Sequence, residues 1–170
     1  MWVSLLLSGE KKFIYAGNDA HGNFNIYRQI KTPMISLREK REQIFGECRT
    51  GVYPDDVGNI SSVIDAMRNG NCFITNGPMV NIKFNYDGGL IVMGGTTRSN
   101  FGTLELDVLS SKEFGKIEEI IIIKGKIGGN NETILFKLLN LNLYRLNKLF
   151  EIFIQNPSYF RCLVKTNDRM

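Results

Sequence analysis

The sequence is poor in the residue types that most often bind metals and carry catalysis. Its 170 residues include a single histidine, His21, and three cysteines. A structural zinc ion needs four ligands, and a catalytic zinc ion usually takes three from the protein. One histidine therefore excludes a site built from several histidines of this chain. We do not expect the chain alone to hold a metal tightly.

The cysteines exclude two further classes of protein. Cys48, Cys72 and Cys162 are odd in number, lie far apart and include no Cys-x-x-Cys pair. This spacing matches neither a disulfide framework nor a zinc knuckle, and it indicates a reducing compartment. We therefore take the cytoplasm as the default location.

A long apolar run is also missing. The opening MWVSLLLSG is apolar but short, and it has no basic start and no small-residue cleavage site. About 18 apolar residues are needed to cross a bilayer, and a signal peptide begins with a basic region. We therefore expect no membrane partner, and we interpret this stretch as the end of a buried helix.

No concentrated basic patch accompanies the net charge of +4 and the pI of about 9.0. Lysines and arginines are scattered and interleaved with glutamates, as in LREKRE at residues 37–42. Alternating signs of this kind are typical of a solvated helix face rather than of a nucleic-acid-binding stripe. Nucleic-acid binding is therefore not expected.

Residues 1–78 combine helical and strand patterns, as α/β proteins do. The apolar run FIYAG at residues 13–17 predicts a short strand. Apolar positions with helical spacing predict a helix over residues 35–45. The clearest unit follows: a helix that begins at Ser61 or Ser62 and ends at Gly70, before a strand.

Residues 79–170 consist of short β-rich runs separated by Gly and Asn clusters. Runs and turns of this kind are typical of an antiparallel sandwich or a small barrel. We place a domain boundary near Pro78, after the Asn76-Gly77-Pro78 turn. The predicted fold class is therefore α/β followed by all-β, and the β half is interpreted as a structural appendage.

The candidate chemistry lies in GNDAHGNFN at residues 17–25. In an extended segment, residues i and i+2 point to the same side, so Asp19 and His21 can converge on one ion. Their oxygen and nitrogen donors suit zinc, manganese or iron. The alternative is that Asp-x-His is a polar turn, since so short a pattern is common by chance.

Three segments, in order, resemble the C-terminal part of PHP-domain (polymerase and histidinol phosphatase-like) metal-dependent phosphoesterases. They are GNDAHGNFNIYRQI, FGECRTGVY and VIDAMRNGNCFITNGP, within residues 1–80. The first contains the family's last metal-ligand motif. The last resembles the edge of the same domain in members that carry an appended β-sandwich.

The resemblance implies a specific fold and chemistry. Residues 1–78 would be the C-terminal portion of a (β/α)7-type barrel, and residues 79–170 a β-sandwich-like domain. Asp19 and His21 would be metal ligands in a site where metal-bound hydroxide attacks a phosphate-ester substrate. Arg28 and Arg49 would be possible phosphate contacts.

Asn18 and Asn23 are further candidates for contacts to the metal ligands or the substrate.

Missing family motifs limit this interpretation. The family's opening His-x-His, its middle Glu and its further histidines are absent from this sequence. The chain is therefore expected to be a piece of a larger enzyme, inactive alone, with the rest of the site on a missing N-terminal barrel half or a partner chain.

Two other hypotheses remain open. One is a non-enzymatic β-sandwich binding module with a vestigial α/β cap, because the β half has the more complete set of elements. The other is a small metal-binding module in which Asp19 and His21 of two subunits meet.

Overall fold

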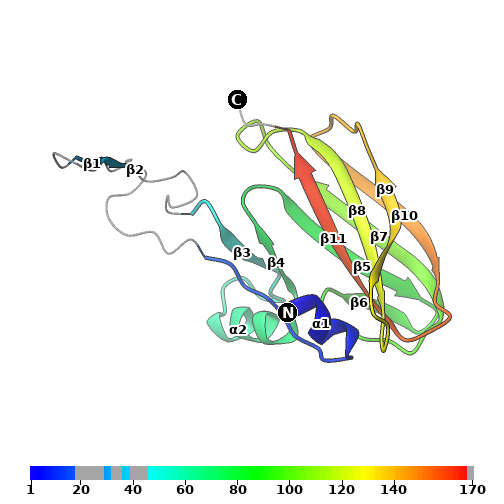
Figure 1. Ribbon diagram of the computed structural model, residues 1–170. Coiled ribbons are helices and arrows are strands. Elements are labelled where there is room, and N and C mark those ends of the chain that lie inside the picture. Colours follow the sequence, from blue (N-terminus) through cyan, green and yellow to red (C-terminus); the bar gives the residue numbers. More distant parts are fainter. Residues whose placement is uncertain (18–28, 32–35, 39–45, 168–170) are drawn as a thin grey trace.

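The computed structural model describes residues 1–17, 29–31, 36–38 and 46–167 of the chain. Within these residues, most of the regular structure is antiparallel β-sheet (Figure 1). A small helix-containing unit at the N-terminal side adjoins a larger β-structure (Figure 1).

Two antiparallel sheets form the larger part of the fold. One has four strands in the order β10-β7-β5-β6, and the other has three in the order β11-β8-β9. The strands are β5 Met79–Tyr86, β6 Gly89–Val92, β7 Phe101–Leu109, β8 Ile117–Lys126, β9 Glu132–Leu138, β10 Arg145–Phe153 and β11 Ser158–Thr166. The predicted antiparallel β-structure after residue 78 is confirmed, while the position of the domain boundary stays a prediction.

Alternation along the strands produces one core between the two sheets. In β7, Leu106 and Val108 are fully buried, whereas the residues between the buried positions point to the outer face of the sheet. Ile120 of β8 is buried in the same cluster. The rings of Phe136 in β9 and Phe150 in β10 lie 4.6 Å apart across the two sheets. The sheets therefore pack as a sandwich.

The unit before the sandwich contains α1 Trp2–Leu7, β3 Arg49–Val52, α2 Ile60–Asn69 and β4 Cys72–Thr75. Strands β3 and β4 pair antiparallel, with α2 in the connection between them. The βαβ repeat of an α/β barrel has parallel strands. The expected portion of a (β/α)7-type barrel is therefore not seen among the residues that the structure describes.

Helix α2 ends as predicted but begins differently. Gly70 adopts the left-handed conformation at φ 77°, which terminates the helix as expected. The N-cap is Asn59, whose Oδ1 atom accepts the Ser61 N–H at 2.9 Å. The prediction of Ser61 or Ser62 was wrong because Ser62 is already used by the preceding loop: its Oγ atom accepts the Asp56 N–H at 3.0 Å.

Two local predictions in the first half were also wrong. Ser36–Arg38, inside the predicted helix, forms strand β2 and pairs antiparallel with β1 Gln29–Lys31. The predicted strand over residues 13–17 joins no ladder. Its Phe13 ring packs where a side chain on Gly70 would project, so tertiary contacts rather than strand pairing fix this segment.

Helix α1 is short and only its last residue, Leu7, is buried. In the described part of the chain, no helix has the length and apolar character needed to cross a membrane.

Candidate functional site

The predicted metal ligands, Asp19 and His21, lie outside the described residues, as do Asn18, Asn23 and Arg28. Their assignment as ligands or as substrate contacts therefore stays a prediction. The segment that leads to them is described as far as Gly17.

This leading segment is tied to β3 and α2 by side-chain hydrogen bonds. The Ala16 N–H donates to Thr50 Oγ1 at 2.9 Å, and the Thr50 hydroxyl donates to the Ala16 carbonyl at 3.2 Å. The Tyr15 hydroxyl donates to the Met67 carbonyl in α2 at 2.8 Å. The point at which the chain enters the Asp-x-His stretch is thus fixed three residues before Asp19.

Arg49 is the one predicted site residue that falls in the described part of the chain. It lies next to Thr50 in β3, and its guanidinium carbon is 5.1 Å from the centre of the Phe114 ring. The same ring packs where a side chain on Gly77 would project, in the turn before β5. Cation–π stacking of this kind contributes about 0.5–1 kcal/mol at exposed sites. Arg49 therefore joins β3 to the loop between β7 and β8.

Among the residues the structure describes, no three His, Cys, Asp or Glu side chains come close enough together to hold a metal ion.

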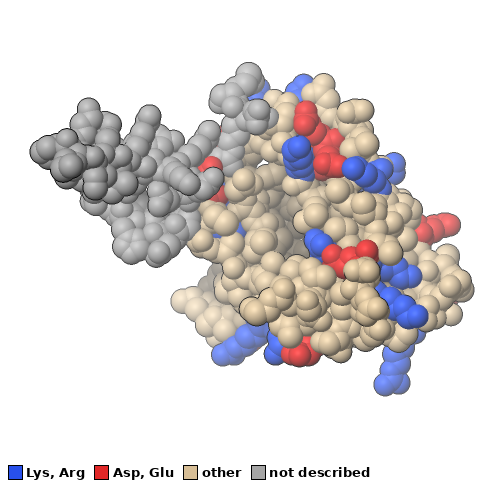
Figure 2. Space-filling view, viewed as in Figure 1, with Lys and Arg blue, Asp and Glu red and all other residues tan. Residues whose placement is uncertain are grey.

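The described surface mixes charges of both signs. On the face shown in Figure 2, Lys and Arg side chains are interleaved with Asp and Glu. The expectation that the chain does not bind nucleic acid is not tested by this arrangement and stays a prediction.

A polar hollow lies on the outer face of the four-stranded sheet. Its volume is about 50 Å³, and it is lined by Asn81, Lys83, Glu105 and Asp107. The Oδ1 atom of Asp107 is buried and accepts no hydrogen bond from the described residues. Arg145 Nε lies 3.6 Å from that atom, an ion-pair distance that is too long for a hydrogen bond.

Tyr53 stands close to this hollow. Burial raises the pKa of its phenol, and the negative charge of Asp107 raises that pKa further. The residue is held in place by Asn71, which accepts the Tyr53 N–H at its own carbonyl and donates its side-chain amide to the Tyr53 carbonyl. The backbone of Tyr53 is therefore held in place, with its phenol near the carboxylate of Asp107.

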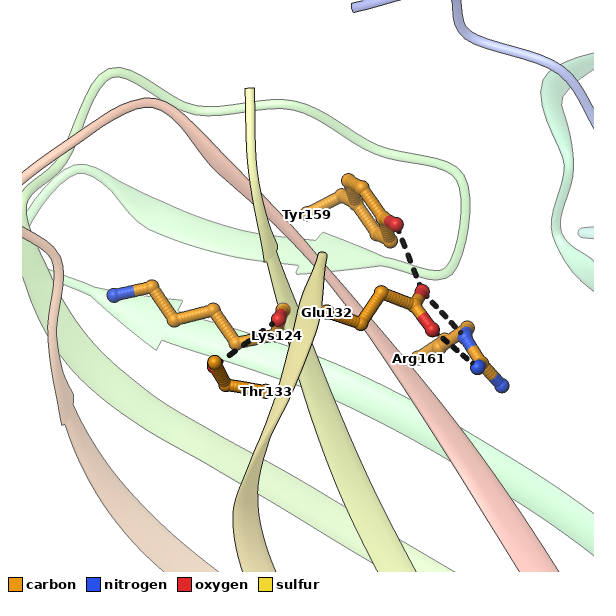
Figure 3. A network of polar contacts seen from close by, with 5 residues as sticks. All are labelled: Lys124, Glu132, Thr133, Tyr159 and Arg161. Atoms are coloured by element: carbon orange, nitrogen blue, oxygen red, sulfur yellow. Dashed lines mark hydrogen bonds and ion pairs between the residues drawn. The ribbon is translucent and has the colours of Figure 1, made fainter. Parts of the chain in front are cut away.

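A second group of polar residues, the Glu132 cluster, crosses the outer face of the three-stranded sheet (Figure 3). It consists of Glu132 on β9 with Tyr159 and Arg161 on β11. Arg161 donates from Nε to Glu132 Oε1 at 2.8 Å and from Nη2 to Oε2 at 2.5 Å, and the Tyr159 hydroxyl donates to Oε1 at 2.7 Å. Gly125 of β8 lies between the two strands, and a side chain there would collide with the Tyr159 ring.

The Glu132 cluster perturbs the titration of all its members. The hydrogen bond from Arg161 holds the pKa of the Glu132 carboxyl below its ordinary value. The same bond raises the pKa of Arg161. Burial, followed by the hydrogen bond to Glu132, raises the pKa of Tyr159 to about 12. A carboxylate that accepts three charge-stabilising hydrogen bonds is a poor proton acceptor, so this cluster is suited to holding strands together.

Sequence reasoning missed both the Glu132 cluster and the polar hollow. The alternation in GTLELDVL places Glu105 and Asp107 on one face of β7, so part of the hollow could have been found. Glu132 and Arg161 are 29 residues apart, and only the pairing of β9 and β11 with β8 brings them together. The sequence signal for the cluster was weaker. It is Gly125, a glycine inside the long apolar strand of residues 117–126, which indicates that another group approaches the backbone closely there.

Comparisons of the chain with protein-family models, with curated proteins and with solved structures found no match.

Proposed function

We propose that this chain is the C-terminal part of a metal-dependent phosphoesterase of the PHP type, to which it contributes Asp19 and His21 as metal ligands. The observation that carries the proposal is the Asp-x-His pair placed directly after a fixed segment. Ala16 and Tyr15 attach that segment to β3 and α2, so the chain reaches Asp19 from a defined anchor. The resemblance of three segments in order to the same family is the second support.

The donor set fits a divalent ion only in part. A carboxylate oxygen and a neutral imidazole nitrogen suit zinc, manganese or iron, but two ligands do not complete a site for any of them. The remaining ligands would come from an N-terminal barrel half or from a partner chain. When bound, the metal would lower the pKa of a water molecule and attract the oxygens of a phosphate ester.

The other predicted residues would act on the substrate. Arg28 and Arg49 would bind phosphate oxygens, since a guanidinium offers paired N–H donors that match their geometry. The Phe114 ring restrains the guanidinium of Arg49, which lowers the entropy lost when it binds an anion. Asn18 and Asn23 would position the ligands or the substrate by hydrogen bonds.

An exposed apolar surface on the helix-containing unit supports the need for a further segment. Ile60 of α2 is 78% exposed and Val57 just before it is 84% exposed. Ile64, one helical turn after Ile60, is 41% exposed, and Ile74 of β4 is 46% exposed. Ile60 and Ile64 share one face of α2, and contiguous apolar side chains on a protein surface mark interaction sites. We assign this surface to the remaining part of the barrel.

Hydrolysis of p-nitrophenyl phosphate tests the proposal. The chain alone should show no metal-dependent hydrolysis, whereas the chain joined to the polypeptide encoded directly upstream in the same gene region should hydrolyse the ester. His21→Ala in the joined protein should lower kcat by at least about a hundredfold, because loss of a metal ligand removes the nucleophile. Asn85→Ala, on the sandwich, serves as a matched control and should leave kcat unchanged.

Two outcomes would contradict the proposal. Robust hydrolysis by the isolated chain would show that it holds a complete site. Unchanged hydrolysis by the joined protein carrying His21→Ala would remove His21 from the metal ligands.

The second candidate function is a non-enzymatic binding module, and the sandwich core favours it. All the residues of the buried core cluster, from Phe84 to Ile152, belong to the β half. A core of this kind does not require the helix-containing unit. This second function replaces the first on two conditions. The joined protein must show no hydrolysis of p-nitrophenyl phosphate, and residues 79–170 alone must bind a partner molecule as well as the whole chain does.

A further inference from the structure

The outer face of the four-stranded sheet presents polar side chains in ordered rows. Strand register places them side by side across β10, β7 and β5, because directly paired residues point to the same face. The rows are Asn147, Asp107 and Asn81; Glu105 and Lys83, with the exposed apolar Leu149 paired beside Glu105; and Glu151, Thr103 and Asn85. The polar hollow lies within the first two rows.

The side chains around the hollow have hydrogen-bonding capacity that the described residues do not use. Asn81, Lys83 and Glu105 make no side-chain hydrogen bond or ion pair within the described part of the chain. The buried Oδ1 atom of Asp107 also accepts none there. Because these groups are both donors and acceptors, a ligand in the hollow must offer both in turn.

The charges around the hollow balance. Glu105 and Asp107 carry two negative charges, and Lys83 with Arg145 carries two positive ones. A metal cation would meet the ammonium of Lys83, and an anion would meet the two carboxylates. A neutral ligand rich in hydroxyl groups avoids both repulsions, since each hydroxyl donates one hydrogen bond and accepts others.

Aromatic rings lie near both ends of this outer face. The phenol of Tyr53 lies near enough to Asp107 for that charge to raise its pKa, and Asn71 holds the Tyr53 backbone. Phe101 and Phe153 form a directly paired couple at the far end of the same face, 51% and 62% exposed. Phe153 lies four residues along β10 from Leu149, which corresponds to about 14 Å. A ligand that reaches from Tyr53 to this pair is longer than one sugar ring.

We propose that this outer face, centred on the polar hollow, binds a neutral oligosaccharide. The hydroxyl groups of the saccharide hydrogen-bond to the amide, ammonium and carboxylate groups of the hollow. Its C–H faces pack on the exposed rings of Phe101 and Phe153, which offer an apolar surface. This site is separate from the proposed phosphoesterase site and does not depend on it.

Titration of the full chain with soluble saccharides tests the site. The probes are short cello-, malto-, xylo- and chito-oligosaccharides, and binding is followed by backbone amide NMR shifts and by calorimetry. At least one saccharide should shift amides of β5, β7 and β10. Asn81→Ala and Glu105→Ala should each weaken that binding about tenfold, because each removes a hydrogen bond to a bound polar group.

Glu118→Ala, an exposed position on the three-stranded sheet, is the matched control and should bind as the wild type does. Both hollow variants should keep the amide spectrum of the other sheet, which verifies their folding. Failure of every saccharide to shift amides of β5, β7 or β10 would overturn the proposal, as would full binding by Glu105→Ala. Binding of free amino acids or inorganic phosphate at the hollow, with no saccharide bound, would also overturn it.

Discussion

The carboxylate of Glu132 joins two strands that a third strand separates. It reaches from β9 across Gly125 to Tyr159 and Arg161 on β11. The side chains of Glu132 and Arg161 are 13% and 22% exposed, so water screens their ion pair only in part. The pair of Glu119 and Lys137 on the same sheet is more exposed and makes no bidentate contact. The free energy of unfolding should therefore depend more on the Glu132–Arg161 pair than on the Glu119–Lys137 pair.

Glu132→Gln should destabilise the protein by about 1–3 kcal/mol, because Arg161 is left partly buried without its anion. Glu119→Gln is the matched control and should cost less than about 1 kcal/mol. Urea denaturation of both variants measures the difference. Equal losses in the two variants would show that the Glu132 cluster contributes no more than a surface ion pair.

The pH dependence of stability follows from the same cluster. The folded-state pKa of Tyr159, about 12, is raised above the ordinary value of 10.0, so the protonated phenol stabilises the folded state. This contribution is complete below pH 10 and is lost as pH rises toward 12. In Tyr159→Phe, the loss of stability across that range should be smaller than in the wild type. An identical alkaline profile in the two proteins would exclude this role.

The Glu132 carboxyl gives the opposite dependence. Its folded-state pKa is lowered, so its contribution is present above the unfolded value, near 4.5, and is lost as pH falls through the folded pKa. Acid denaturation of Glu132→Gln should therefore depend less on pH below that value than denaturation of the wild type. An equal acid dependence would contradict the assignment.

At the scale of elements, α2 shows how a local signal can be correct at one end and wrong at the other. Gly70 is a glycine where the backbone needs a positive φ, which is a strong and local constraint. Near the N-terminus of α2, Asn59, Ser61 and Ser62 are all residue types that can cap a helix. The hydroxyl oxygen of Ser62 accepts the Asp56 N–H of the preceding loop, and the side chain of Asn59 caps the helix by accepting the Ser61 N–H.

Asn59→Ala should destabilise the protein by about 1 kcal/mol, because the Ser61 N–H loses its acceptor at the start of α2. Ser61→Ala is the control, since the exposed Ser61 side chain accepts no capping hydrogen bond, and it should change stability by less than about 0.5 kcal/mol. Thermal denaturation ranks the two variants. A larger loss in Ser61→Ala would contradict the cap seen here.

At the scale of the whole molecule, the sequence predicts the β half better than the first half. Strict alternation in β7 and a long isoleucine run in β8 each determine a strand from its own residues. The partners of each strand, and so the Glu132 cluster and the polar hollow, depend on contacts between residues far apart in sequence. In the first half, Phe13 packs at Gly70 instead of joining a ladder, and no local pattern encodes that contact.

Residues 79–170 should fold without residues 1–78, because the buried core cluster is drawn only from this half. A fragment of this range should give a dispersed amide spectrum and a cooperative urea transition. Its stability should be lower than that of the full chain, since Gly77 packs on Phe114 and the backbone of Asn69 packs at Gly94. An unfolded fragment would show that the two halves form one folding unit.

The imidazole of His21 offers the most direct test of the central claim that Asp19 and His21 bind one metal ion. Since His21 is the only histidine of the chain, its imidazole NMR signals can be identified directly. Zinc should shift these signals, and Asp19→Ala should raise the zinc concentration required by about tenfold, because one ligand is lost. His21 signals that do not respond to zinc, or that respond equally in Asp19→Ala, would contradict the claim.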